Sequence, residues 1–216
     1  MKAEIITIGT ELLLGQIIDT NAAFIAQQLA NIGFDVYRKT TVGDNEVRIS
    51  AAISKALKRS DVVITTGGLG PTVDDKTREA VALATERELV LDEKLLQDIK
   101  EFFKRRGLTL GKNNPLQAQI PEESIPIHNP VGTAPGFIVK FRKSYVISLP
   151  GVPRELHHLM DLTVLPFLKK EFDIQAVIVT RVLRTAGEGE SNIDRRIAKF
   201  EESSPVKSTE THRFQI

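Results

Sequence analysis

The stretch "DVVITTGGLGPTVDDKTREAVALATER", residues 61–87, decides the fold of this chain. It begins with a continuous apolar run at 61–66, which is typical of a strand covered on both faces of a parallel sheet. A glycine-rich turn follows, and residues 75–87 then have the spacing of a helix. A strand, a turn and a helix in this order form one unit of an α/β protein.

Two similar units come before this stretch. Residues 3–9 and 34–43 have the patterns of strands, and the segments 21–33 and 45–60 that follow them have helical spacing. Three consecutive strand and helix units predict an α/β fold with a mostly parallel, helix-covered sheet and right-handed crossovers.

The rest of the first domain is less regular. An amphipathic helix at 92–107 needs no strand directly before it, and the polar segment after it predicts a long surface connection. Three short strands are expected next, with a hairpin turn between the last two. A helix at 152–172 should be kinked or shortened by Pro166. The long connection is expected at 108–124, and the three short strands are expected at 124–129, 136–141 and 144–151.

The pattern changes again near residue 172. We expect one domain at 1–171 and the start of a second, small α+β domain at 172–216, which is only partly contained in the chain. Its predicted elements are a strand at 176–187, a helix at 189–202 and a strand at 211–216.

Composition excludes several classes of protein. Lys and Arg total 29 against 28 for Asp and Glu, so the balance of +1 argues against a nucleic-acid or membrane partner. The chain has no cysteine, which excludes a disulfide framework and thiolate metal sites. No leader-like order of charged and apolar residues and no membrane-length apolar run is present, so we expect a soluble, cytoplasmic protein.

The glycine turn is the first candidate binding site. Ligands of open α/β sheets lie at the carboxyl ends of the strands, where this turn is expected. Gly67, Gly68 and Gly70 would let backbone amides approach a phosphate at the positive end of the next helix. The alternative is an ordinary tight turn in which Asp74 or Asp75 caps that helix.

Asp74 and Asp75 are also candidate metal ligands, because two carboxylates beside a phosphate repel it unless a cation lies between them. A solvated acidic turn is the alternative. Glu79 is one helical turn after Asp75, and Glu11 and Asp19 are expected at the same sheet edge, so all three are candidates for a base or a further ligand. For Glu79, a solvated helix position fits equally well.

Further candidates lie in other turns. Asp19 and Asn21 follow the first strand, although they also suit a helix N-cap. The turns "NPVGTAPG" and "LPGVPRE" can present amides to an anion. The candidate ligand-binding residues in these turns and in the long connection are Gly132, Thr133, Gly151 and Asn114.

Four motifs carry a resemblance to a known family: "GTELLLGQIIDTN", "TTGGLGPTVDDKTREAVA", "NPVGTAPGF" and "LPGVPRELHHLM". Together they resemble the amino-terminal domain of the CinA family, the competence/damage-inducible protein A group. This resemblance implies the molybdopterin-binding fold of MogA, MoaB, MoeA and gephyrin. In the glycine loop, Leu69 replaces the usual Thr and Asp74 the usual Arg. The positions that match are Gly67, Gly68, Gly70, Asp75, Thr77, Glu79 and Ala80.

The resemblance also implies a function. It favours a metal-dependent hydrolase, an ADP-ribose pyrophosphatase, using magnesium, cobalt or manganese with potassium. Asp75, Glu79 and Glu11 would be catalytic, and Thr77 would join the residues that bind the nucleotide. The alternative is a non-catalytic module that binds a nucleotide or molybdopterin and accompanies a nicotinamide mononucleotide deamidase domain absent from this chain. The family resemblance further implies a homo-oligomer, and we expect a homodimer.

Overall fold

The computed structural model describes residues 1–175, 187, 189, 191–193 and 195. The chain divides into two compact units, Met1–Val179 and Thr180–Ile216. Every element described below belongs to the first unit. The strands and the helix predicted beyond residue 175 fall almost wholly outside the described residues, and the boundary at 172 stays a prediction.

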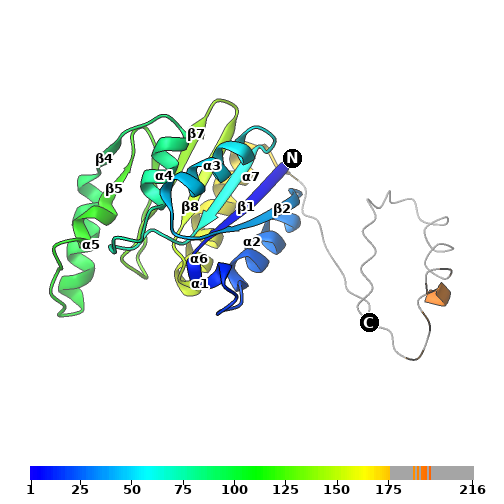
Figure 1. The fold of residues 1–216 in the computed structure, drawn as a ribbon, viewed down its shortest axis with the longest axis horizontal. Coiled ribbons are helices and arrows are strands. Elements are labelled where there is room, and N and C mark those ends of the chain that lie inside the picture. The colour runs from blue at the N-terminus through cyan, green and yellow to red at the C-terminus, as the bar shows by residue number, and fades with distance from the viewer. Residues whose placement is uncertain (176–186, 188, 190, 194, 196–216) are drawn as a thin grey trace. The chain divides into compact units, whose positions relative to one another are not determined.

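The first unit is built on a six-stranded sheet with the order β2-β1-β3-β8-β7-β6 (Figure 1). The first four strands in this order run parallel, and β7 and β6 are antiparallel to their neighbours. The prediction of a mostly parallel sheet is therefore confirmed. The strands are β1 (Lys2–Ile8), β2 (Asp35–Val42), β3 (Val62–Thr66), β6 (Ile125–Ile127), β7 (Gly136–Phe141) and β8 (Ser144–Leu149).

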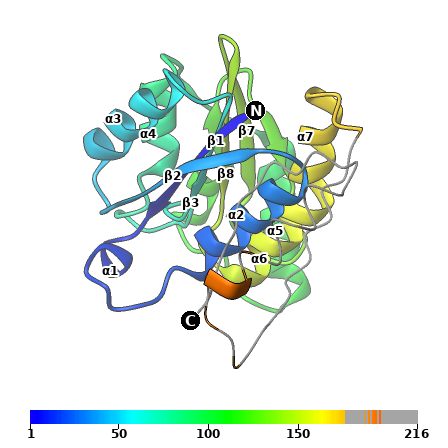
Figure 2. The same cartoon turned by 90° about the vertical axis from the view of Figure 1, so that its right-hand side faces the viewer.

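Helices cover both faces of the sheet. Figure 2 shows α2, α6 and α7 on one side and α3 and α4 on the other. Ile5 and Ile6 of β1 are both fully buried, one in each of two apolar cores, because successive side chains of a strand point to opposite faces. The helices are α1 (Thr10–Leu13), α2 (Thr20–Asn31), α3 (Glu46–Leu57), α4 (Thr77–Ala84), α5 (Glu93–Arg105), α6 (Pro153–Leu159) and α7 (Leu165–Glu171).

The long connection after α5 differs from the prediction. It contains a 3₁₀ helix η1 (Asn114–Ala118) and a strand β5 (Gln119–Pro121), which pairs with β4 (Leu89–Leu91) in a separate antiparallel sheet. A strand therefore does precede α5 directly, and Gln117 and Ala118 are buried. Strands of three residues carry too little periodicity to be found in a sequence.

The interruption by Pro166 is confirmed. Between α6 and α7 the chain forms a π-helical segment η2 (Met160–Val164), and Pro166 lies in the first turn of α7. Proline has no amide to donate, so a wider turn before it lets the helical path continue without that hydrogen bond.

Among the described residues, no helix combines the length and the apolar character needed to cross a membrane.

The strand register brings three turns to one edge of the sheet. Thr7 of β1 pairs with Thr66 of β3, and Thr66 pairs with Leu149 of β8. The segments that begin at Gly9, Gly67 and Pro150 therefore leave the sheet side by side, at the carboxyl ends of the parallel strands. This is the edge where α/β proteins bind ligands.

Candidate functional site

A cleft of about 640 Å³ lies at this edge. Its wall is formed by the turns after β1, β3 and β8, with contributions from η1 and from the turn before β7. The predicted site residues on the wall are Glu11, Asp19, Asn21, Gly67, Gly68, Gly70, Asp74, Asp75, Thr133 and Gly151. The remaining four, Thr77, Glu79, Asn114 and Gly132, do not line the cleft but contact its surroundings.

The glycine loop turns sharply as it leaves β3. Gly67 has a φ of 101°, and Gly68 has a φ of 66°, both in the region that favours glycine. A side chain at Gly67 would also collide with the carbonyl oxygen of Ile8 on the neighbouring strand. The loop can take this path only with glycine at these positions.

Thr77 and Arg78, at the start of α4, hold every carbonyl of the loop from Gly67 to Gly70. The Thr77 side chain donates to the Gly67 carbonyl at 2.7 Å, and the Thr77 amide donates to that of Gly68. The buried Arg78 guanidinium donates to the carbonyls of Leu69 and Gly70, at 2.7 and 2.8 Å. Sequence reasoning missed Arg78, whose only signal is its place beside Thr77 in the first turn of a helix.

Unlike the carbonyls, most amides of the loop have no hydrogen-bond partner in the described part of the chain. The Gly67 amide donates to the Leu149 carbonyl at 3.1 Å, so it is not available to a ligand. In the described part of the chain, the amides of Gly68, Leu69 and Gly70 make no hydrogen bond. Three consecutive free amides on a cleft wall, next to a helix N-terminus, are a typical anion-binding arrangement.

Asp74 and Asp75 do not cap α4, because Lys76 occupies its N-cap position without a side-chain hydrogen bond. The capping alternative is therefore wrong for this pair. Asp75 instead closes the loop: one carboxylate oxygen accepts from the Thr72 amide and hydroxyl at 2.8 and 2.6 Å. Asp74 is exposed and makes no hydrogen bond within the described residues.

The cleft wall carries an excess of acid. Six carboxylates line it, and its described lining includes no Lys or Arg. Asp19 accepts from the Ala22 amide at 2.8 Å and caps α2, so the capping alternative holds for this residue. The acids are Glu11, Asp19, Asp44, Asp74, Asp75 and Glu155.

A divalent cation on this wall would need ligands from a bound molecule or water as well as from the side chains. Within the described residues, no three His, Asp or Glu side chains are grouped closely enough to hold a metal alone. Magnesium is commonly bound by one or two carboxylates together with ligand phosphates and water. Asp74 and Asp75 are the acids next to the free amides, and they would hold a cation that a bound phosphate shares.

Glu79 lies beside the loop anchor rather than on the wall. One of its carboxylate oxygens is buried and has no hydrogen-bond partner among the described residues. Burial lowers the pKa of the neighbouring Arg78, while the charges of Glu79 and Asp75 act in the opposite direction. This position suits a counter-charge for Arg78 better than a base in the cleft.

Asn21 and Asn114 contribute to polar networks around the cleft. Asn21 donates to the Gly151 carbonyl at 2.7 Å, and its buried side-chain oxygen has no partner in the described structure. Asn114 donates to Gln117, which in turn donates to Thr133 at 3.4 Å. Gln117 is on the wall and only 1% exposed, so Asn114 acts one contact behind it.

Glu155 of α6 is a wall residue that sequence reasoning did not single out. It accepts a hydrogen bond of 2.6 Å from Asn129. Burial raises the pKa of Glu155, and the bond from Asn129 partly offsets that effect. A side chain at Gly132 would overlap the Glu155 carboxylate, so Gly132 leaves the space that this acid occupies on the cleft wall.

Comparison with known proteins identifies the family. A family model described as "Probable molybdopterin binding domain" matches residues 4–170. A crystal structure of CinA from Thermoplasma acidophilum, itself of unknown function, has a TM-score of 0.70 and 40% identity, and the match covers 79% of this chain and 96% of that one. The chain belongs to the CinA family.

Longer CinA-family relatives are similar over most of this chain. The "Putative competence-damage inducible protein" of Alkaliphilus oremlandii is 49% identical over 197 residues, which cover 91% of this chain and 47% of the relative. That of Halothermothrix orenii is 45% identical over 94% of this chain and 49% of its own length. The chain therefore spans about half the length of these relatives.

The fold extends beyond the CinA family. MoaB from Thermus thermophilus, a molybdopterin biosynthesis enzyme, has a TM-score of 0.56 at 23% identity, covering 80% of this chain and 94% of that one. At this identity the similarity shows the shared fold, as the sequence predicted.

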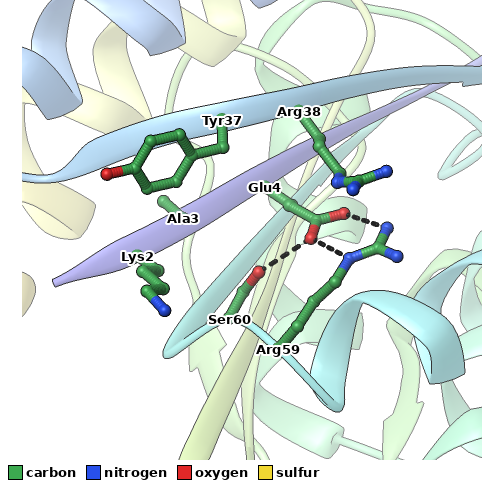
Figure 3. A pocket seen from close by; sticks show the side chains of 7 residues that line it. All are labelled: Lys2, Ala3, Glu4, Tyr37, Arg38, Arg59 and Ser60. Atoms are coloured by element: carbon green, nitrogen blue, oxygen red, sulfur yellow. Dashed lines mark hydrogen bonds and ion pairs between the residues drawn. The ribbon is translucent and has the colours of Figure 1, made fainter.

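A second cavity, of about 310 Å³, lies at the amino edge of the same sheet (Figure 3). Glu4 accepts two hydrogen bonds from Arg59, at 2.5 and 2.8 Å, and one from Ser60 at 2.9 Å. These bonds engage both oxygens of the one acid that lines the cavity, so the cavity has the character of a structural ion pair.

Proposed function

We propose that the cleft binds a small molecule through its phosphate groups, a nucleotide or a phosphorylated pterin. The observation that carries this proposal is the glycine loop, in which every carbonyl is anchored and three consecutive amides are free. Anchored carbonyls fix the direction of the amides before a ligand arrives, so little reorganisation opposes binding.

The size and chemistry of the cleft favour a ligand larger than phosphate. Its volume of about 640 Å³ falls in the usual range for sites of small organic molecules and cofactors. The loop occupies one part of the wall, and Thr133, Gln117 and Glu155 occupy another. A nucleoside diphosphate has an anionic diphosphate that suits the loop, and a sugar and base with polar groups that suit the other part of the wall.

The test compares two buried threonines of α4 and its C-cap. Thr77→Val removes the bond to the Gly67 carbonyl, whereas Thr85→Val removes a bond to the Val81 carbonyl away from the cleft. We expect Thr77→Val to weaken binding of ADP-ribose with magnesium about tenfold, as loss of one anchor of about 1 to 2 kcal/mol implies. Thr85→Val should keep wild-type affinity. Calorimetry that finds no binding of ADP-ribose, ADP or pyrophosphate to the wild-type protein would overturn the proposal.

A second function is favoured by the acids of the wall. Six carboxylates on a wall whose described lining has no Lys or Arg repel a diphosphate unless a cation is also bound. We therefore propose, as the second candidate, metal-dependent hydrolysis of ADP-ribose: water adds across the P–O–P bridge, and AMP and ribose 5-phosphate are released. A divalent cation held by Asp74 and Asp75 would neutralise charge on the diphosphate.

The chain's own residues would have separate tasks in this reaction. The free amides would bind diphosphate oxygens, and Arg78 would keep them aimed at the cleft. The Glu11 side chain makes no hydrogen bond within the described residues and lines the wall, so it is the best placed of the predicted bases. It would accept the proton of the attacking water.

Turnover distinguishes the two candidates. The chain is incubated with ADP-ribose and magnesium, cobalt or manganese, with and without potassium, and AMP is measured. AMP release that disappears in Asp75→Ala while ADP-ribose binding survives supports the hydrolase. If ADP-ribose binds but no AMP is released with any of these metals, the chain is a binding module rather than a hydrolase.

A further inference from the structure

The cleft has a second polar wall that the glycine loop does not explain. Gln117, Thr133 and Glu155 come from three separate parts of the chain and line the same cleft as the free amides. Gln117 donates to Thr133, so the two side chains hold one another in place. Glu155 is the only member of this set that bears a charge.

Glu155 is held in place by its surroundings. Asn129 donates one hydrogen bond to Glu155 at 2.6 Å and a second to the Ala134 carbonyl at 2.8 Å. Asn129 also accepts from the Val131 amide at 3.2 Å, so its amide is fixed in direction. Gly132 leaves the space in which the carboxylate lies. A carboxylate with this much support has a defined position in the cleft.

The second oxygen of Glu155 is unused. Asn129 binds Oε2, and Oε1 makes no hydrogen bond in the described part of the chain. Glu4 provides the contrast, because both of its oxygens are bonded by Arg59 and Ser60. Glu155 is half-buried, and its Oε1 is not one of the buried side-chain atoms that lack a partner, so this oxygen is accessible from the cleft. Burial opposes the charge on Glu155, as its raised pKa shows, so its position is not one that stability alone favours.

The chemistry of a carboxylate limits what Glu155 can bind. An ionised carboxylate accepts hydrogen bonds and donates none, so it repels a phosphate and attracts hydroxyl or N–H groups. A site built to hydrogen-bond such a donor strongly disfavours analogues that lack it. The donors of a nucleotide are its ribose hydroxyls and the amine or ring N–H of its base.

Resting on the proposed binding of a phosphate-bearing ligand, we propose that Glu155 is a specificity residue: its free oxygen accepts a hydrogen bond from the non-phosphate part of a nucleotide. The glycine loop would bind the diphosphate, and Glu155 would select nucleotides over diphosphates that lack a sugar and a base. Asn129 is then a positioning residue that fixes the carboxylate.

The test measures affinity for ADP and for pyrophosphate, both with magnesium, by calorimetry. Glu155→Gln keeps the size of the side chain and its bond from Asn129 but replaces the free acceptor by a donor. Glu155→Asp keeps the charge but withdraws it by one methylene, and it serves as the second variant. Asp161→Asn, an exposed acid further along the same helical run, is the matched control. Far-UV and near-UV circular dichroism verify folding of each variant.

We expect both Glu155 variants to bind ADP about tenfold more weakly than wild type, the effect of one lost hydrogen bond to a charged group. Pyrophosphate should bind them as well as it binds wild type, or more tightly to Glu155→Gln because a negative charge is gone. Asp161→Asn should match wild type for both ligands. Equal ADP affinity in wild type and both variants would overturn the inference while the proposed function survives. Equal losses for ADP and pyrophosphate would also overturn it, and absence of any binding to wild type would remove both.

Two further ligands identify which donor Glu155 binds. With 2′,3′-dideoxy-ADP the ribose hydroxyls are missing, and with purine riboside 5′-diphosphate the base amine is missing. If Glu155 binds the hydroxyls, the difference between wild type and Glu155→Gln disappears for the dideoxy ligand alone. If it binds the amine, the difference disappears for the purine ligand alone. A tenfold difference that persists for both ligands would overturn the assignment to a ligand donor.

Discussion

The two edges of the central sheet differ in whether their acidic side chains are paired with basic ones. At the amino edge, the single acid Glu4 is 4% exposed and is bonded by Arg59 and Ser60, beside the further basic residues Lys2 and Arg38 (Figure 3). At the carboxyl edge, six acids line a cleft whose described wall has no basic side chain and whose glycine loop keeps three amides free. Both edges belong to the same strands.

The difference shows which features of a cavity indicate a ligand. Polar groups that are mutually satisfied contribute to the stability of the folded chain and need nothing more. Groups that are fixed in position but left without partners lower stability and are retained at functional sites. A test of this comparison should therefore separate stability from ligand binding, residue by residue.

The largest effect is expected at Arg78, whose hydrogen bonds both stabilise the folded chain and fix the direction of the free loop amides. Arg78→Met leaves the Leu69 and Gly70 carbonyls without donors, so we expect a loss of about 3 kcal/mol in the free energy of unfolding, measured with urea. ADP binding should fall at least tenfold, because the loop amides lose their fixed direction.

Arg87 provides the control for Arg78. It also donates to two carbonyls, those of Glu122 and Lys140, but it does not line the cleft. Arg87→Met should lower stability, by less than Arg78→Met because its bonds are exposed, and should leave ADP affinity unchanged. Similar losses of affinity in both variants would show that the loop anchor has no special role in binding.

Glu4 tests the structural edge. The hydrogen bonds from Arg59 hold the pKa of Glu4 below its ordinary value, against the opposing effect of burial. A depressed pKa means that the ionised acid stabilises the folded state above the ordinary pKa and that this stabilisation is lost as the pH falls through the depressed value. Glu4→Gln should therefore cost about 2 kcal/mol near neutral pH and progressively less below pH of about 4, in urea unfolding at each pH.

Ligand affinity gives the other half of the Glu4 prediction. Since Glu4 lies at the edge away from the cleft, ADP should bind Glu4→Gln and wild type equally well. A variant that loses affinity in proportion to stability would contradict the separation of the two edges.

Glu155→Gln should change the free energy of unfolding in the opposite direction from Glu4→Gln. Its pKa is raised chiefly by burial, so the folded state favours the protonated acid, and the ionised acid opposes folding once the pH rises through the raised value. Glu155→Gln removes this opposition. We expect a gain on the order of 0.5 kcal/mol near neutral pH and none in acid, in the same urea measurements. Stability that falls at neutral pH would show that Glu155 is a structural acid like Glu4.

Much of this arrangement can be read from the sequence. The buried run before Gly67 and the helical spacing after Asp75 predict the strand, loop and helix, because local periodicity determines them. The meeting of the turns at one edge follows from the parallel order of the strands. The short strands β4 and β5 were missed, because their pairing depends on residues about 30 positions apart.

The details of the site depend on contacts that the sequence does not contain. The loop glycines predict an anion site, but only the structure shows that the Gly67 amide is bonded to Leu149 and that Arg78 anchors the loop. Glu155 lies within a motif that was already of interest, yet its significance depends on Asn129, 26 positions earlier. Such pairs carry no periodic signal, since they are formed by the packing of separate elements.

The smallest effect on stability is expected at the rim of the cleft, between β1 and α2. Four large apolar side chains are exposed within six residues there, and Ile18 is 87% exposed. Ile18→Ser removes almost no buried surface, so the free energy of unfolding should change by less than about 0.5 kcal/mol. The four residues are Leu13, Leu14, Ile17 and Ile18.

Association between copies of the chain is where Ile18 should matter. Concentrated exposed apolar surface is typical of interaction sites, and the homodimer expected from the family resemblance would bury this rim. Sedimentation velocity over a range of concentrations should then show Ile18→Ser dissociating at higher concentration than wild type. Leu162→Ser, which alters an exposed leucine of η2, should dissociate as wild type does. If both variants sediment alike, the rim is not the interface, and its apolar side chains remain available to a ligand in the cleft that Leu12, Ile17 and Ile18 help to line.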